Sequence, residues 1–202
     1  FPLSGAVLLP GGRLPLNIFE PRYLSMVRDA IASPHRLIGM IQSYDDADEQ
    51  GRAGALYDIG CAGRISSFSE SDDGRVMITL SGTTRFRRLE DHEVEDGYRL
   101  AQVSWADFEA DLAPVADTIQ RDHLVSVLHD YFKIKGFTAD WDQLDDCEDE
   151  RLVTTLSMIC PFDVPEKQAL LEANSLPDRT QLLIAILEMA SHSDSDEAGA
   201  RH

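Results

Sequence analysis

Residues 1–23 read FPLSGAVLLPGGRLPLNIFEPRY and contain two apolar runs, a turn and the start of a helix. Residues 6–9 and 14–18 are predicted strands, because the Pro10-Gly11-Gly12 segment between them favours a turn. Pro21 suits the first position of a helix, and the apolar residues that follow it recur at helical spacing. The stretch therefore predicts a strand–turn–strand unit joined directly to a helix.

Three polar side chains interrupt this apolar stretch, Asn17, Glu20 and Arg22. They could be catalytic groups, a clamp for a ligand, or parts of the strand–helix joint. We favour the joint, because an acid just before a helix interacts well with the positive end of the helix dipole. Ile18 and Phe19 should then pack beneath the helix. Asn17, Glu20 and Arg22 remain our candidates for contact with a partner, and we expect Glu20 and Arg22 to affect stability more than binding.

The first half of the chain beyond this joint reads as β structure. Further strands are predicted in five runs, residues 37–42, 56–68, 75–80, 83–89 and 98–105. Glycine inside strands marks bends or bulges, and Gly60, Gly63 and Gly82 indicate a closed, strongly bent barrel. Residues 1–106 are therefore predicted to form a β-barrel lobe with one early helix.

The second half changes to a helical period. Leu124, Leu128 and Tyr131 follow i, i+4, i+7 spacing, and Pro165 and Pro177 each precede another helical pattern. Residues 107–190 should form a lobe of about four helices. Residues 191–202 are polar and small, which predicts a disordered tail. The predicted fold class is α+β, a β pseudo-barrel followed by helices.

Composition restricts the classes of partner. The formal net charge is −18, of which residues 1–105 carry −4 and residues 106–202 carry −14. Affinity for nucleic acid comes from neutralising phosphates, so we do not expect nucleic acid to bind the second half. No apolar run reaches the roughly 20 residues of a membrane helix. Three cysteines without CxxC spacing indicate free thiols in the cytoplasm, and the start at Phe1 indicates missing N-terminal residues.

Motifs for nucleotide and acyl-transfer chemistry are absent from the sequence. The three lysines, Lys133, Lys135 and Lys167, lie outside any P-loop, and none looks buried enough for a Ser-Lys dyad. A Ser-His-Asp triad stays open, because its members need not be sequence neighbours, although no G-x-S-x-G elbow occurs. We predict no enzyme activity, no catalytic residue and no cofactor.

Metal binding is also not expected. His123 and His129 are six residues apart, which places them on different faces of a helix, whereas a zinc pair favours i, i+4. The acidic run DWDQLDDCEDE, residues 140–150, lacks the glycine that a calcium-binding EF-hand loop requires. A solvated, partly disordered linker is the preferred interpretation, with weak divalent binding as the alternative.

The basic cluster Arg85-Phe86-Arg87-Arg88 allows two interpretations. Arg85 and Arg87 share one face of the predicted strand, and an aromatic residue between basic ones could contact RNA. Acidic residues follow within a few positions, however. We therefore favour cross-strand ion pairing over RNA binding.

Three blocks of the sequence carry a family resemblance. FPLSGAVLLPGGRLPLNIFEPRYLSMV resembles the opening of the Lon substrate-binding domain, the N-terminal domain of the ATP-dependent protease Lon. IGCAGRISSFSESDDGRVMITLSGTTRFRRLE is similar to its Gly-x-x-x-x-Ile strand, Asp-Gly hairpin and Gly-x-x-Arg-Phe strand, and FDVPEKQALLEANSLPDRTQLLIAILE to its closing helices. Asn17 stands where many members carry His, and Cys61 where Thr is common.

The resemblance implies a PUA-like pseudo-barrel followed by a helical lobe, and a stand-alone bacterial Lon-domain protein without the ATPase and peptidase domains. It implies recognition of unfolded or extended protein segments. The more specific hypothesis is that the chain passes these segments to a separate protease. The alternatives are RNA binding, by analogy with PUA domains, and an unrecognised serine hydrolase. The oligomeric state is left open.

Overall fold

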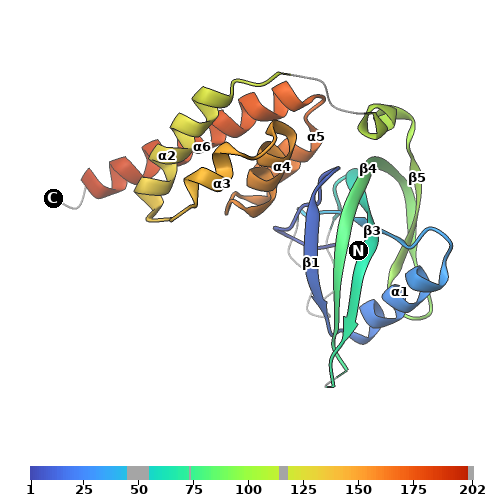
Figure 1. Ribbon diagram of the computed structural model, residues 1–202. Helices are drawn as coiled ribbons and strands as arrows, with labels where there is room; N and C mark the ends of the chain where they lie inside the picture. Colours follow the sequence, from blue (N-terminus) through green and yellow to red (C-terminus); the bar gives the residue numbers. More distant parts are fainter. Residues whose placement is uncertain (45–54, 73, 114–117, 200–202) are drawn as a thin grey trace. The chain divides into compact units, whose positions relative to one another are not determined.

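The computed structural model describes residues 1–44, 55–72, 74–113 and 118–199, with side chains up to His192. It divides into two compact units. Unit 1 comprises Phe1–Pro114 and Pro161–Leu171, and unit 2 comprises Val115–Cys160 and Glu172–His202. Unit 1 holds the sheet and unit 2 is helical, which gives the α+β fold class predicted from the sequence (Figure 1).

Unit 1 is built on a five-stranded antiparallel sheet. The order is β1-β4-β3-β2, and β5 pairs with the far end of the long strand β4. The strands are β1 (Arg13–Ile18), β2 (Leu37–Met40), β3 (Ile59–Glu70), β4 (Val76–Glu93) and β5 (Arg99–Ser104).

Two predictions for these strands need correction. Gly82 does not divide the runs 75–80 and 83–89, because β4 continues through it as one strand. Residues 6–9 are not a strand, although Val7, Leu8 and Leu9 are buried. Their side chains fill the core without a partner strand for their backbone, a distinction that an apolar run by itself does not encode.

The sheet curls but its strand pairing does not close. β1 pairs with residues 76–81 of β4 and β5 with residues 87–93, while β3 occupies the other edge of β4. Among the described strands, β2 therefore lies at one edge of the sheet, and β1 and β5 lie at the opposite edge. The predicted closed barrel is thus a pseudo-barrel that is open between β2 and β5.

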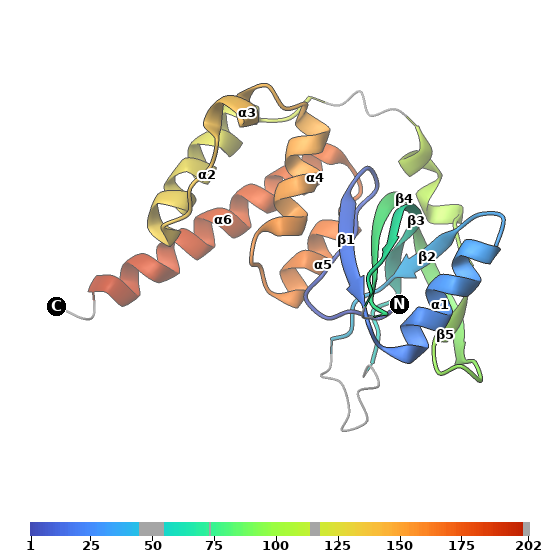
Figure 2. The same cartoon turned by 60° about the horizontal axis from the view of Figure 1, so that its bottom comes forward.

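Helices cover the sheet of unit 1. α1 (Pro21–Ala32) begins with Pro21 at its first turn, as predicted, and buries Met26, Val27 and Ala30. The short 3₁₀ helix η1 (Ala106–Leu112) follows β5, and α5 (Val164–Glu172) returns from later in the chain. In both views α1 lies beside β5 (Figures 1 and 2).

Most of α5 is part of unit 1, together with the sheet. From the sequence we expected it to lie in a separate helical lobe spanning residues 107–190. Lys167 Nζ donates a 2.8 Å hydrogen bond to the Gly5 carbonyl, and Gln168 Nε2 donates one of 3.0 Å to the Ile59 carbonyl. Lys167 is 7% exposed, so the expectation that none of the lysines is buried is wrong. The apolar periodicity predicted this helix. It did not predict that Lys167 and Gln168 are buried, because their hydrogen-bond acceptors are backbone carbonyls far away in the sequence.

Helices are the only regular elements in the described part of unit 2. α2 (Arg121–Lys135) buries Leu124, Leu128 and Tyr131, the predicted spacing, and packs along α6 (Leu176–Gly199) (Figure 2). α3 (Trp141–Asp145) and α4 (Asp149–Ile159) complete the unit. None of the described helices has the length and hydropathy needed to cross a membrane.

Two polar segments of unit 2 are more ordered than predicted. α6 continues to Gly199, past the predicted start of a disordered tail at Ser191, because no proline or glycine interrupts it earlier; residues 200–202 lie outside the described part. The acidic run 140–150 forms α3 and starts α4. Asp140 caps α3, its carboxylate accepting from the Gln143 amide at 3.2 Å.

Candidate functional site

A cavity of about 350 Å³ opens in unit 1 between α1, β2 and β5. This volume lies at the lower end of the roughly 300–1,000 Å³ found for ligand pockets. The floor is apolar and comes from β2 to β5 and the segments next to them. It is formed by Ile38, Ile41, Leu56, Ala62, Phe86 and Val103.

Small residues around Phe86 shape this floor. A Cβ added to Gly60 would lie 2.6 Å from the Phe86 ring, and one added to Gly39 would lie 3.1 Å from it. Side chains at these positions would therefore displace the ring. On the solvent side Phe86 meets Trp105 edge-on, with ring centroids 6.1 Å apart. Glycine next to an aromatic residue thus sets the depth of the cavity.

Polar groups in the cavity lining are paired with each other. The Asp91 carboxylate accepts from Arg88 Nη1 at 2.7 Å and from Arg99 Nε at 2.9 Å. Tyr98 Oη donates a 2.5 Å hydrogen bond to Asp29 on α1. This hydrogen bond, together with desolvation, raises the pKa of Tyr98 to about 12. The phenol therefore stays neutral and joins the end of β5 to α1.

We predict that Tyr98→Phe lowers the free energy of unfolding by about 1 kcal/mol at neutral pH, since it removes this one hydrogen bond. The raised pKa favours the protonated phenol in the folded state. The contribution of Tyr98 to the free energy of unfolding is therefore complete below pH 10 and disappears as the pH rises towards 12. Urea unfolding between neutral and alkaline pH, with tyrosinate absorbance as a second signal, should show an alkaline loss that is smaller in Tyr98→Phe. Equal losses in both proteins would contradict the assignment.

The mouth of the cavity exposes large apolar side chains on and after β5. Leu100 is 47% exposed and Trp105 is 43% exposed, and both line the cavity. Exposed apolar side chains around a concave site are typical of surfaces that bind another molecule. The site thus combines an apolar interior with an apolar rim.

The three candidate contact residues lie away from the cavity lining. Asn17 is exposed on the outer face of β1, opposite Met77 in the strand register. Glu20 accepts from Arg22 Nη2 at 2.8 Å, and Arg22 stacks over Tyr23. Glu20 therefore pairs with Arg22 and does not cap the helix with its side chain. Their contact with a partner stays a prediction.

Phe19 also differs from its predicted place. We expected it to pack with Ile18 beneath the helix, but Phe19 is 63% exposed and Ile18 is 3% exposed. The two residues are neighbours at the end of an alternating strand, so they point to opposite faces. The helix start covers only one of these faces.

The arginine cluster is ion-paired, as predicted, but mostly with different partners. Arg85 pairs with Asp111 and Arg87 with Asp107, both from η1. Arg88 alone pairs with an acid close in sequence, Asp91, at 2.7 Å. The acidic residues of η1 pair with Arg85 and Arg87 because η1 lies against β4. This arrangement gives no support to an RNA-binding surface.

A metal-binding constellation is not found in the part of the chain that the structure describes. No group of three or more metal-ligating side chains occurs there. His129 stacks on Trp141 with ring centroids 3.8 Å apart, and His123 lies 3.4 Å from Glu188. Both histidines of α2 therefore have structural neighbours on the helices around them.

Sequence reasoning did not identify the cavity residues. Their strands were predicted, but nothing in an alternating pattern shows that two strand edges stay apart and leave a hollow. The one available signal was the set of small residues, Gly39, Gly60 and Ala62, opposite the aromatic Phe86. Their spacing becomes informative only when the register of β2, β3 and β4 is known.

Curated relatives of the chain are Lon proteases. Lon protease of Flavobacterium johnsoniae is 23% identical over 185 residues, 88% of this chain and 22% of that protein. Lon protease 2 of Sorangium cellulosum is 31% identical over 87 residues, 43% of this chain and 11% of that protein. The chain spans less than a quarter of the length of these relatives.

Solved structures agree with the fold. The Lon N-terminal domain protein from Xanthomonas campestris has a TM-score of 0.63 at 27% identity, covering 92% of this chain and 95% of that chain. The N-terminal domain of Mycobacterium avium complex Lon protease has a TM-score of 0.58 at 14% identity, covering 93% and 96%. Residues 1–189 match the family model described as ATP-dependent protease La (LON) substrate-binding domain. The chain therefore belongs to the Lon substrate-binding domain family.

Proposed function

We propose that this chain is a non-catalytic module that binds extended, apolar segments of other proteins. The observation that carries the proposal is the apolar cavity of about 350 Å³ beside β5 in a member of a substrate-binding family. A folded protein buries its apolar side chains, whereas an unfolded one presents them in extended chain. The cavity would select for the unfolded form.

The energetic basis is burial of the exposed rim. Leu100 and Trp105 keep roughly half of their surface in water, and covering apolar surface yields about 25 cal/mol per Å². Both side chains are already held on or beside a paired strand, so little ordering of this chain opposes binding. Covering the rim therefore favours binding of a segment that brings apolar side chains to it.

Trp105 offers a direct signal for the experiment. In a Trp141→Phe variant, Trp105 is the remaining tryptophan. We expect its fluorescence to shift to shorter wavelength on titration with reduced, carboxamidomethylated ribonuclease A, which is unfolded, basic and free of tryptophan, and to stay unchanged with native ribonuclease A. No response to the unfolded form at tens of micromolar, together with no binding by anisotropy, would overturn the proposal.

A matched pair of variants localises the binding. We predict that Leu100→Ser weakens binding of carboxamidomethylated ribonuclease A about tenfold, or about 1.4 kcal/mol, because Leu100 lines the cavity mouth. Leu89→Ser should change it less than about twofold, since Leu89 is comparably exposed, at 53%, but lies outside the cavity lining. Equal effects of the two substitutions would place binding elsewhere.

Delivery to a protease is the finer part of the proposal. The curated relatives carry this domain within Lon proteases, of which the chain spans only a part. We propose that segments bound at the cavity are passed to a peptidase, in this protein or in a separate one. Faster degradation of carboxamidomethylated ribonuclease A by a cell extract when the chain is added, and loss of this gain in Leu100→Ser, would support it.

A further inference from the structure

We propose that the bound segment pairs its backbone with the free edge of β5, places an apolar side chain in the cavity and carries basic residues beside that side chain. The inference rests on the proposed function and specifies its geometry and the chemistry of the ligand. Strand addition of this kind gives affinity through main-chain hydrogen bonds and specificity through pockets for alternate side chains.

The edges formed by β1, β2 and β5 differ in how they are protected. β1 contains Pro15, which cannot donate a ladder hydrogen bond. β2 is only four residues long, and residues 1–3 bond with Ile41 at its end. β5 has six residues, no proline and no lysine, and among the described residues it pairs with β4 alone. β5 is therefore the edge most open to another strand.

The hydrogen-bond register shows which groups of β5 face outward. In the hairpin turn the Val94 amide donates to the Tyr98 carbonyl at 2.9 Å. Hydrogen-bonded and non-bonded pairs alternate along an antiparallel ladder. The pairs at Leu100 and Gln102 are then bonded to β4, and the N–H and C=O groups of Arg99 and Ala101 point away from it. Ala101 is also exposed, so its amide is available to a partner strand.

The same strand borders the cavity. Leu100, Ala101 and Val103 all line it. A segment paired with β5 would pass directly over the mouth, where successive side chains point alternately towards the cavity and away from it. One side chain of the segment can therefore enter the apolar floor while its backbone remains paired.

Charge specifies the residues next to this side chain. At the hairpin end of β5 the exposed side chains are acidic, Glu93, Glu95 and Asp96, and Asp29 lines the cavity nearby. Arg88 pairs with Asp58 and Asp91, and Arg99 also pairs with Asp91, so two carboxylates offset these two arginines. Arg28 is the exposed base next to Asp29. The excess negative charge favours lysine or arginine in the segment.

A designed peptide tests all three features. The probe is Lys-Thr-Thr-Phe-Thr-Thr-Lys-amide, labelled at its N-terminus with the zwitterionic dye tetramethylrhodamine so that both lysine charges remain, and titrated by anisotropy. We expect Ala in place of Phe to weaken binding about tenfold at equal charge. Glu in place of both lysines, with the same N-terminal label, should weaken it to a similar degree, and added salt should reduce that difference.

Backbone pairing is tested by N-methylation of the same peptide. Amides of alternate residues face the same strand, so methylation at positions of one parity should weaken binding about tenfold and at the other parity hardly at all. In the protein, Ala101→Pro removes an outward donor without removing a ladder bond, and should weaken binding while Ala101→Ser does not. The melting temperature of each variant shows whether it is folded.

Each contrary result has a distinct meaning. If the peptide or carboxamidomethylated ribonuclease A binds but neither N-methyl parity nor Ala101→Pro matters, strand addition is overturned and the proposed function stands. If neither ligand binds, both proposals fail. A dimer in sedimentation that Ala101→Pro dissociates, without peptide binding, would assign the β5 edge to a second copy of the chain and also overturn the inference.

Discussion

Replacing Arg85 with alanine should lower the free energy of unfolding by about 3–5 kcal/mol, because it leaves the Asp111 carboxylate buried without its counter-ion. The two side chains are only 5% and 8% exposed, and Arg85 Nη2 lies 2.7 Å from Asp111 Oδ1. Arg85 Nε donates to the same carboxylate at 2.9 Å. The substitution therefore removes a bidentate ion pair between Arg85 and Asp111 that is shielded from water.

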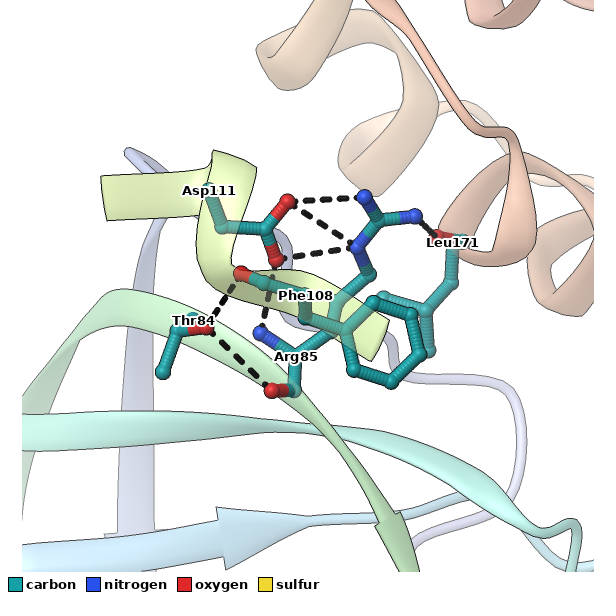
Figure 3. A network of polar contacts seen from close by, with 5 residues as sticks. All are labelled: Thr84, Arg85, Phe108, Asp111 and Leu171. Carbon is teal, nitrogen blue, oxygen red and sulfur yellow. Dashed lines mark hydrogen bonds and ion pairs between the residues drawn. The ribbon is translucent and has the colours of Figure 1, made fainter. Parts of the chain in front are cut away.

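The guanidinium also connects three elements of unit 1 (Figure 3). Its Nη1 donates to the Leu171 carbonyl of α5 at 3.1 Å, and its Cζ atom lies 4.8 Å from the centroid of the Phe108 ring of η1. The backbone amide of Arg85 donates to Asp111 at 2.9 Å. Alanine at this position would leave the Leu171 carbonyl and part of the carboxylate without these donors.

Urea unfolding followed by circular dichroism measures the effect, with Arg87→Ala as the matched control. Arg87 lies two residues further along β4 and pairs with Asp107, but these side chains are 44% and 53% exposed, so its loss should cost no more than about 1 kcal/mol. The double variant Arg85→Met/Asp111→Leu should recover much of the stability, because no charge is left buried. Similar losses for Arg85→Ala and Arg87→Ala would show that the pair is not effectively buried.

Gly82→Ala should destabilise the protein by about 3 kcal/mol, at the upper end of the cost of overpacking. A Cβ on Gly82 would lie 2.0 Å from the Leu9 carbonyl oxygen, and backbone cannot move aside as a flexible side chain can. Gly82 donates to the Gly12 carbonyl at 2.9 Å and accepts from the Gly11 amide at 3.1 Å. Relief of the clash would break these bonds, each of which contributes about 1 kcal/mol.

Thermal and urea unfolding of Gly82→Ala and Ser81→Ala provide the comparison. Ser81 is the preceding residue of β4. Its hydroxyl donates a 2.9 Å hydrogen bond to the hydroxyl of Ser66, which is exposed. Ser81→Ala should therefore change the stability by less than about 1 kcal/mol. A Gly82→Ala protein as stable as Ser81→Ala would mean that the segment around Leu9 moves away from β4 at little cost.

Much of the fold follows from local patterns. The helix after Pro21, the strands around the Asp72–Gly74 hairpin and the helical spacing of Leu124, Leu128 and Tyr131 were all predicted, because apolar periodicity and turn residues act over a few positions. Errors arose where a pattern has two solutions. The apolar run 6–9 fills the core without being a strand, and Gly82 allows a close backbone approach without ending β4.

The candidate site depended on contacts that no local pattern contains. Tyr98 bonds with Asp29, 69 residues earlier, and the cavity floor joins Ile38 with Phe86 and Val103. The polar residues that stood out in the sequence, Glu20 and Arg22, pair with each other instead. Conspicuous polarity in an apolar stretch thus indicated a local ion pair, whereas the site itself is made mostly of ordinary apolar residues.

The sequence by itself determined the types of element, their order and the resemblance to the Lon substrate-binding domain, since each depends on residues close together in the chain. Only the tertiary structure decided that β5 is an open edge, that a cavity lies beside it and that Arg85 is buried against Asp111. These features depend on which strands pair and which edges remain apart. That outcome is set by the register of the whole sheet, because a shift of one residue would turn every side chain of a strand to its other face.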